Sequence, residues 1–200
     1  MNVTTEFDTV DLILKSTAET RGVDAFALAL IKTEKQLRKL FTYLIFQFPC
    51  FSYADIPSLR SALATNNRVY FDGFEQGINR LIPYPTNELI GNDYQHLRSR
   101  LSQAVDYRNK IFHGQLTTDE LERDELIALV NDLRKWCEML ANSALARVGY
   151  DGFKRNSFQK SADTKISNIY ITQIKNIEDY AVFIKQHVQR QRITEHQVTI

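Results

Sequence analysis

The residues best suited to chemistry lie together between Asp106 and Gly114, in the stretch DYRNKIFHG. At about 100° per residue, Arg108 falls roughly 20° from Leu97 on a predicted helix, which places it on the apolar face. A guanidinium keeps its proton, so an arginine that faces a core needs a carboxylate, a phosphate or a polar cleft. His113 follows five residues later, and imidazole titrates close to neutral pH. The stretch therefore predicts a site that holds an anion beside a proton-transfer group.

A second charged residue interrupts the apolar face of another predicted helix. Counted from Leu30, Glu34 lies roughly 40° around the helix and Arg38 roughly 80°, whereas Lys39 at about 180° is expected to face solvent. The simplest way to satisfy both Glu34 and Arg108 is to bring them together. Two interpretations of such a pair stay open, a buried structural ion pair and a polar cleft with chemistry in it.

The pattern Arg108-Asn109-x-x-x-His113, followed by Gly114, resembles the signature of the HEPN superfamily, an Arg and a His separated by four to six residues. The resemblance covers roughly residues 20–150, and the run Glu34-Lys35-Gln36-Leu37-Arg38-Lys39 is similar to a pattern on the first core helix of some members. It implies a small helical bundle that forms dimers. Catalytically active members are metal-independent endoribonucleases, so the resemblance also implies this activity.

The spacing by itself is a weak signal, because Arg190 and His196, with five residues between them, also fit the pattern in the polar tail, where no core helix is expected to position them. Position and neighbours distinguish Arg108 and His113 from that pair. Members linked to nucleotide transferases carry a Tyr two residues after the His. That position is Gln115 here, which speaks against regulation through such a tyrosine and against pairing with an antitoxin of that type.

Cleaving RNA without a metal requires a base for the 2′-OH proton, a positive charge for the phosphorane and an acid for the leaving 5′-oxygen. His113 suits the role of base or acid, and Arg108 can bind the phosphate through two N–H groups. Asn109 can orient the imidazole or the substrate. Glu34 can hold Arg108 in place, and Arg38 can add a second phosphate contact. The predicted site consists of four catalytic residues, Arg108, His113, Asn109 and Glu34, and three substrate-binding residues, Arg38, Lys110 and Tyr107. One histidine per chain cannot easily be both base and acid, so we expect a composite site at a homodimer interface.

Simpler interpretations of the same residues remain open. His113 could be a cation at a helix C-terminus that interacts with the helix dipole. Tyr107 could stack on a base, although an aromatic residue near a helix end is more often part of the core. The basic residues Arg98 and Arg100 could follow a phosphate backbone or simply face solvent.

Composition limits the class of protein. The 200 residues are 44% hydrophobic with only 7 Gly and 4 Pro, which favours one sizeable core. The formal net charge of +1 gives no global attraction to nucleic acid, so such a partner needs a local cluster of cations. Cys50 and Cys137 lack metal-type spacing and are expected to be reduced, packed thiols of a cytoplasmic protein. No signal peptide or membrane span is expected.

Helical periodicity predicts an all-α, HEPN-like bundle of about five core helices in residues 1–150. The expected helices cover residues 24–48, 57–63, 69–81, 93–113 and 117–148, the last opened by a possible capping box of Thr117 and Glu120. Residues 151–200 are expected to form a C-terminal extension with a loop, a possible short strand around residues 169–172 and an amphipathic helix over residues 177–189.

Together these features predict a metal-independent endoribonuclease of the toxin or defence type, without a metal or cofactor. Its expected partners are RNA, a second copy of the chain and an antitoxin or defence-system protein, with no membrane. One alternative is a non-catalytic HEPN-like module that binds RNA, nucleotide or a protein partner. Another is a helical adaptor in which the Glu34 and Arg108 pair is purely structural.

Overall fold

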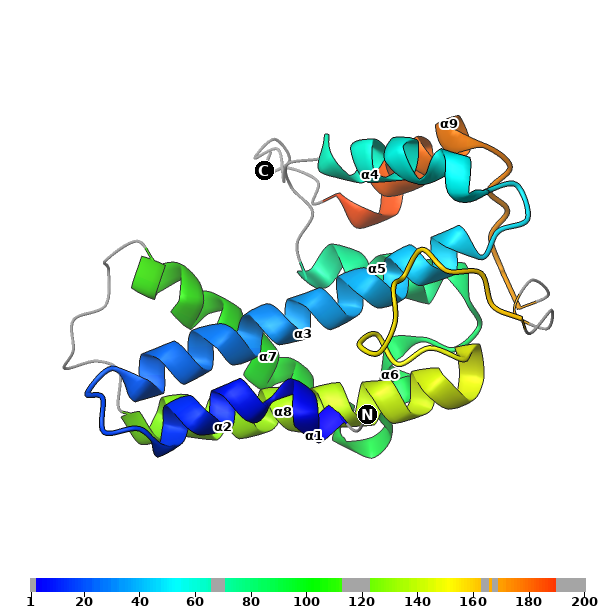
Figure 1. Ribbon diagram of the computed structural model, residues 1–200. Helices are drawn as coiled ribbons and strands as arrows, with labels where there is room; N and C mark the ends of the chain where they lie inside the picture. Colours follow the sequence, from blue (N-terminus) through cyan, green and yellow to red (C-terminus); the bar gives the residue numbers. More distant parts are fainter. Residues whose placement is uncertain (1–2, 66–70, 113–122, 163–165, 167–168, 190–200) are drawn as a thin grey trace, which may run out of the picture.

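The computed structural model describes residues 3–65, 71–112, 123–162, 166 and 169–189 (Figure 1). These residues form helices and connecting loops without a β-strand, which confirms the predicted all-α class. In chain order the α-helices are α1 (Val3–Glu6), α2 (Asp8–Lys15), α3 (Arg21–Phe46), α4 (Ile56–Ala64), α5 (Phe71–Leu81), α6 (Thr86–Ile90), α7 (Tyr94–Phe112), α8 (Arg123–Val148) and α9 (Ile177–Phe183). Short turns of tighter or wider helix are η1 (Tyr53–Asp55), η2 (Gly91–Asp93) and η4 (Ile184–Val188).

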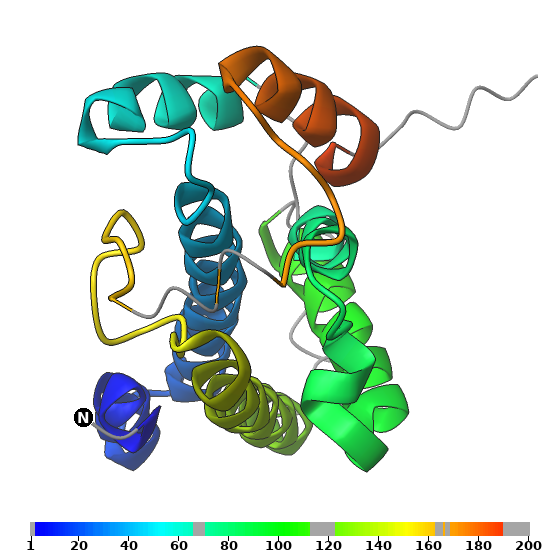
Figure 2. The same ribbon diagram turned by 90° about the vertical axis from the view of Figure 1, so that its right-hand side faces the viewer.

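Helix α3 is the centre of the fold. It packs against α8, α5 and α2. Its C-terminal half is buried on nearly every side, and the tail of the chain covers the face that these helices leave open. The helix ends at Phe46, three residues before Pro49, which has no N–H to continue the ladder. The view in Figure 2 shows α3 between the tail on one side and α5 and α7 on the other.

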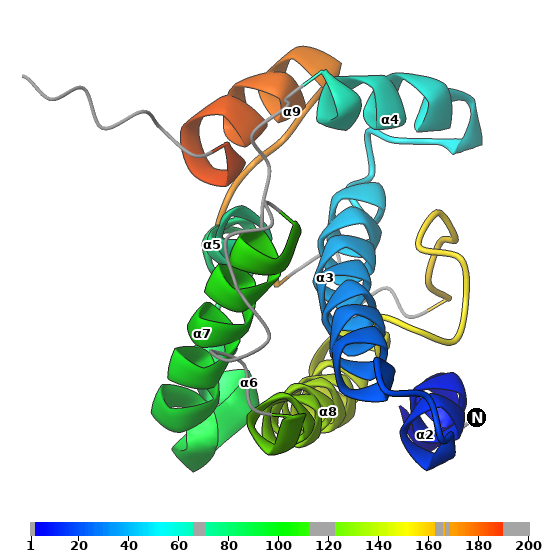
Figure 3. The same cartoon turned by 90° about the vertical axis from the view of Figure 1, so that its left-hand side faces the viewer.

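Helices α7 and α8 pack against each other and close the bundle beside α3 (Figure 3). Leu97, Leu101 and Ala104 of α7 are buried, as are Trp136 and Leu133 of α8. The periodic apolar positions of both helices face this core, as amphipathic helices require. This packing brings the C-terminal half of α7 alongside α3, where the site predicted from the sequence lies.

The long helices α3, α5 and α7 begin and end close to their predicted limits, and α8 ends at its predicted limit, Val148, while the predicted start of that helix at residue 117 lies outside the described residues. The capping box predicted for Thr117 and Glu120 lies outside the described residues, as do His113 and Gly114. The N-terminal helices α1 and α2 and the short α6 were not predicted. Helix α2 is held by the buried side chains Phe7 and Val10 and by an ion pair between Asp11 and Arg134 of α8.

The segment after residue 150 is not a peripheral extension in the part that the structure describes. Its side chains join the same hydrophobic core as α3 and α8, and the buried apolar ones are Phe153, Phe158, Ile166, Ile174, Tyr180, Phe183, Ile184 and Val188. Polar contacts fix the same segment to α3. The Lys160 ammonium donates to the carbonyls of Phe46 and Phe48, and the Tyr170 hydroxyl donates to the Leu44 carbonyl at 2.6 Å. Lys160 thus supplies a donor to Phe46, the last residue of α3, whereas Tyr170 adds a second donor to the Leu44 carbonyl, which also accepts from the Gln47 amide.

The possible strand around residues 169–172 does not form. The Ile171 amide donates to the Leu81 carbonyl at the end of α5, and the Thr172 hydroxyl donates to the Arg80 carbonyl. A β-branched sequence has strand propensity, but a strand needs a neighbouring strand to pair with. This segment instead satisfies the carbonyls at the end of a helix.

The two cysteines differ in their exposure to solvent. Both cysteines are free thiols, Cys137 is buried as predicted, and Cys50 is exposed, contrary to the prediction that it is packed. Cys50 follows Pro49 in the turn after α3, and its thiol donates to the Ile174 carbonyl. Within the described residues, no helix is long and apolar enough to cross a membrane.

Candidate functional site

Glu34 of α3 and Arg108 of α7 lie side by side, as their positions on two core-facing stripes predict. Oε1 of Glu34 is 3.5 Å from Nη2 of Arg108, with side-chain exposures of 31% and 26%. The predicted proximity of the two residues is therefore confirmed. The contact is long for an ion pair, and both side chains remain partly open to solvent.

The pair lines a cavity of about 490 Å³ between α3, α5 and α7. Its lining consists of Ile31, Glu34, Lys35, Arg38, Phe71, Phe74 and Arg108. Three cationic side chains thus face one carboxylate, while the two phenylalanines of α5 provide an apolar wall. Such a hollow is suited to an anion, because local cations and reduced solvation strengthen electrostatic attraction.

Arg108 has donors to spare. Its Nε is buried and has no hydrogen-bond partner among the described residues, and its one ion pair there is the 3.5 Å contact with Glu34. Arg134 also leaves its Nε unpaired, but both of its terminal nitrogens bond Asp11. A buried N–H group without an acceptor is costly, and an anion that accepts from Nε in the cavity would remove that cost.

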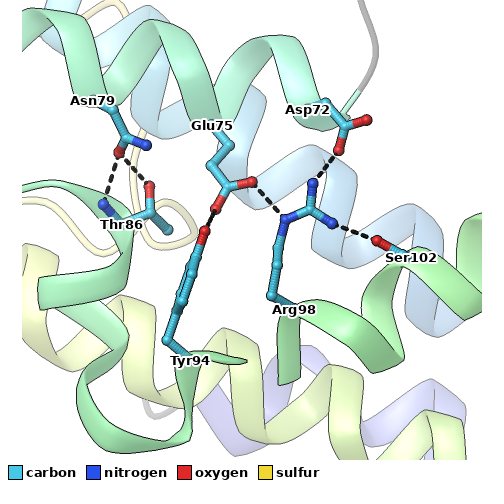
Figure 4. Close-up of polar contacts among 7 residues, drawn as sticks. All are labelled: Asp72, Glu75, Asn79, Thr86, Tyr94, Arg98 and Ser102. Atoms are coloured by element: carbon cyan, nitrogen blue, oxygen red, sulfur yellow. Dashed lines mark hydrogen bonds and ion pairs between the residues drawn. The ribbon is translucent and has the colours of Figure 1, made fainter. Parts of the chain in front are cut away.

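Arg98, ten residues earlier on the same helix, shows the opposite arrangement (Figure 4). Its Nε donates to Glu75 at 2.8 Å, one terminal nitrogen donates to Asp72, and the other donates to Ser102 at 2.7 Å. The Tyr94 hydroxyl donates to the second oxygen of Glu75 at 2.9 Å. Arg98 is therefore fully used in joining α7 to α5 and is not a free phosphate-binding group.

This network also positions the wall of the cavity. Glu75 is only 5% exposed, and burial raises its pKa although the Arg98 guanidinium opposes that shift. The guanidinium of Arg98 lies 5.6 Å above the ring of Phe71, which lines the cavity. Asn79 of α5 accepts hydrogen bonds from the amide and hydroxyl of Thr86 (Figure 4), which fixes the other end of α5.

Burial raises the pKa of Glu34, and the nearby charge of Arg108 partly offsets this effect. Removal from water disfavours a carboxylate, whereas an adjacent cation favours it. Because the direction is upward, burial outweighs the ion pair at this position.

The structure brings together three of the seven predicted site residues. Glu34, Arg38 and Arg108 line the cavity, whereas Asn109 and Lys110 are exposed and outside its lining. The helix rotation of about 100° per residue turns these two side chains away from α3. His113 lies outside the described residues, immediately after the last residue of α7.

Tyr107 faces a different neighbour. Its hydroxyl accepts from Gln103 at 3.0 Å, and the same amide donates to Glu125 of α8. The Tyr107 side chain packs on the core, as expected if this aromatic residue near the helix end has a structural role. Arg100 likewise binds Glu125 and Asp132, so it too serves the packing of α7 on α8.

Four lining residues were not predicted from the sequence: Ile31, Lys35, Phe71 and Phe74. A signal for part of this set was present, because Ile31, Glu34, Lys35 and Arg38 follow the i, i+3, i+4, i+7 spacing of one helix face. The prediction for Lys39 was wrong, since its ammonium donates to the Phe153 carbonyl and lies 5.8 Å from the centre of the Tyr150 ring. The tail covers that face of α3, which the sequence could not reveal.

Comparison with known proteins gives no assignment. No protein-family model matches this chain, and neither the curated proteins nor the solved structures compared with it contain a match. The resemblance to HEPN domains consequently stays a prediction.

Proposed function

We propose that this protein is a metal-independent endoribonuclease that uses Arg108 and His113. The observation that supports this proposal is the partly unpaired Arg108 guanidinium in a cavity with an excess of positive charge. The cavity lies toward the end of α7, and His113 follows that helix in the sequence. A phosphate-binding group and a proton-transfer group are thus five residues apart.

In the proposed reaction, a histidine removes the proton from a 2′-OH, and the resulting oxyanion attacks the adjacent phosphorus. Arg108 stabilises the additional negative charge of the phosphorane, and Glu34 orients Arg108. The bond from phosphorus to the 5′-oxygen then breaks, and a protonated histidine supplies the proton of the leaving group. The products are a 2′,3′-cyclic phosphate and a free 5′-OH.

The proposal includes a homodimer, because a second copy supplies the second histidine at a two-fold axis. Light scattering at micromolar concentration measures this directly. A dimeric mass is expected. A monomeric mass under conditions where RNA is cleaved would contradict the composite site.

Single-stranded RNA incubated with the purified protein in EDTA tests the chemistry. We expect cleavage with 2′,3′-cyclic phosphate ends, and no cleavage of RNA carrying 2′-O-methyl groups. His113→Ala should lower the rate by roughly 10²-fold or more, the usual effect of a positioned acid or base. His196→Ala is the matched control, since Arg190 and His196, with five residues between them, also fit the four-to-six-residue pattern, and its rate should stay at the wild-type value. A need for divalent metal, or full activity in His113→Ala, would overturn the mechanism.

A second candidate function is a non-catalytic module that binds RNA or nucleotide through the same cavity. The excess of cations favours this alternative as well, because it attracts phosphate regardless of His113. Binding that is lost in Arg108→Ala, without cleavage by the wild-type protein, would identify this function.

A further inference from the structure

We propose that Lys35 and Arg38 form a second phosphate subsite beside Arg108, so that the cavity holds two successive phosphates of one RNA strand. This inference rests on the proposed function, since it assigns the scissile phosphate to Arg108. It adds Lys35 to the site and makes the phosphate next to the scissile one a determinant of binding.

The first support is that Lys35 and Arg38 are available. Both are exposed, both line the cavity, and neither forms an ion pair with any residue that the structure describes. The third cation of this basic run, Lys39, is bound to the Phe153 carbonyl and is not available. The fold thus divides the run 35–39 into one lysine that holds the tail and two cations that face the cavity.

The second support is the balance of charge. Glu34, the one carboxylate among the described residues that line the cavity, is paired with Arg108. In the part of the lining that the structure describes, Lys35 and Arg38 therefore have no countercharge. One phosphate at Arg108 would leave them unneutralised, whereas a second phosphate would neutralise them and release counterions.

The third support is spacing. Glu34 marks the position of Arg108 along α3, and Arg38 lies four residues further on, a rise of about 6 Å along the helix. This offset is on the scale of one nucleotide step in an extended strand. The phosphoryl groups of a nucleoside diphosphate share a single bridging oxygen and are too close together to match it. The cavity of about 490 Å³ has room for more than one phosphate.

The experiment measures binding separately from cleavage. A fluorescent 2′-O-methyl trinucleotide carries two phosphates and cannot be cut by attack of the 2′-oxygen. It is compared by fluorescence anisotropy with two analogues in which one or the other phosphate is a neutral methylphosphonate. The proteins are the full-length wild type, Lys35→Ala/Arg38→Ala and the control Lys32→Ala, which changes a cation on α3 that does not line the cavity. Circular dichroism checks that each variant keeps its helical fold.

In the wild type, either neutral phosphate should weaken binding about tenfold, equivalent to about 1.4 kcal/mol. In Lys35→Ala/Arg38→Ala, one of the two replacements should no longer weaken binding, whereas Lys32→Ala should behave like the wild type. The slope of log affinity against log salt should fall by about 0.7 for each cation that no longer contacts a phosphate. Equal losses for both analogues in the double variant and the wild type would overturn the subsite.

The outcome separates this inference from the proposed catalysis. Phosphate-dependent binding that requires Lys35 and Arg38, without cleavage of ordinary RNA, would retain the subsite and reject the enzyme. Cleavage that depends on His113, with phosphate effects independent of Lys35 and Arg38, would do the reverse. ADP and an unlabelled trinucleotide are also compared as competitors of the labelled trinucleotide. If ADP displaces it at a lower concentration, and if this displacement requires Lys35 and Arg38, the ligand is a nucleotide and the proposed binding of a two-phosphate strand is rejected.

Discussion

At the scale of single residues, the difference between Arg98 and Arg108 shows what makes an arginine structural or available. Both project from α7 toward α5 and α3, but Arg98 meets Glu75, Asp72 and Ser102, and its nitrogens are all used. Arg108 meets Glu34 at 3.5 Å and keeps a buried Nε without a partner among the described residues. A guanidinium has five N–H donors, so the number of acceptors around it decides whether it can bind a ligand.

Glu34 gives a prediction that depends on pH. Burial raises its pKa, so the folded protein keeps this proton at pH values where the unfolded chain, near 4.5, has lost it. The folded state then binds more protons, and stability falls as pH rises through this interval. The free energy of unfolding of the wild type, relative to Glu34→Gln, should therefore decrease as the pH rises above about 4.5.

Urea unfolding at several pH values measures this difference. Glu178→Gln, which alters an exposed carboxyl on α9, is the control for the general effect of charge. A difference that grows as pH rises would mean that attraction to Arg108 outweighs burial of Glu34. In that case the carboxylate is tightly paired, and competition by a phosphate is disfavoured.

At the scale of elements, α5 serves both the cavity and the tail. Phe71 and Phe74 line the cavity, while Gly73 and Gly77 allow Val188 of η4 to approach the helix backbone. A Cβ on Gly73 would lie 1.9 Å from the Val188 carbonyl oxygen. The absence of a side chain at this position is what permits the tail to pack there.

Gly73→Ala should therefore destabilise the protein by about 1–3 kcal/mol, as overpacking does. In an open helix the same change would stabilise by about 0.5–1 kcal/mol, so the sign of the effect is informative. Chemical denaturation measures it, with the exposed Gln76→Ala on the same helix as the control. A stability equal to or above that of the wild type would show that η4 does not pack closely on α5 in solution.

At the scale of the whole molecule, the tail completes the core. Phe41 of α3 stacks on Tyr180 and Phe183 of α9, with ring centres 6.4 Å apart in both pairs. Phe41 also contacts Phe74, whose ring centre is 5.6 Å away and which lines the cavity. The aromatic cluster links the tail to the candidate site through one layer of side chains.

A chain that ends at Gly149 should not unfold cooperatively. Each large apolar side chain buried by the tail contributes about 1.5–3 kcal/mol, and several together equal the 5–15 kcal/mol of a typical domain. Differential scanning calorimetry should show a cooperative transition for the full chain and none for the shortened one. A cooperative transition with native near-UV circular dichroism in the shortened chain would establish residues 1–149 as an independent domain.

The sequence alone determined the helical class, the limits of the long helices and the facing of Glu34 and Arg108. These features follow from the 3.6-residue period and from residues that stop helices, which act over a few positions of the chain. Opposite charges on the apolar faces of two helices also predict that the two residues lie close together, because neither charge is stable in a core without a partner.

Only the tertiary structure decided which cations are free. The sequence of α3 gives Lys35, Arg38 and Lys39 the same charge, yet Lys39 is bound by a loop more than a hundred residues away, with Phe153 as its acceptor. It likewise cannot show that Glu75 and Asp72 occupy Arg98 while Arg108 keeps unused donors. Local periodicity sets the direction of a side chain, but the partners that meet it there come from distant segments through packing.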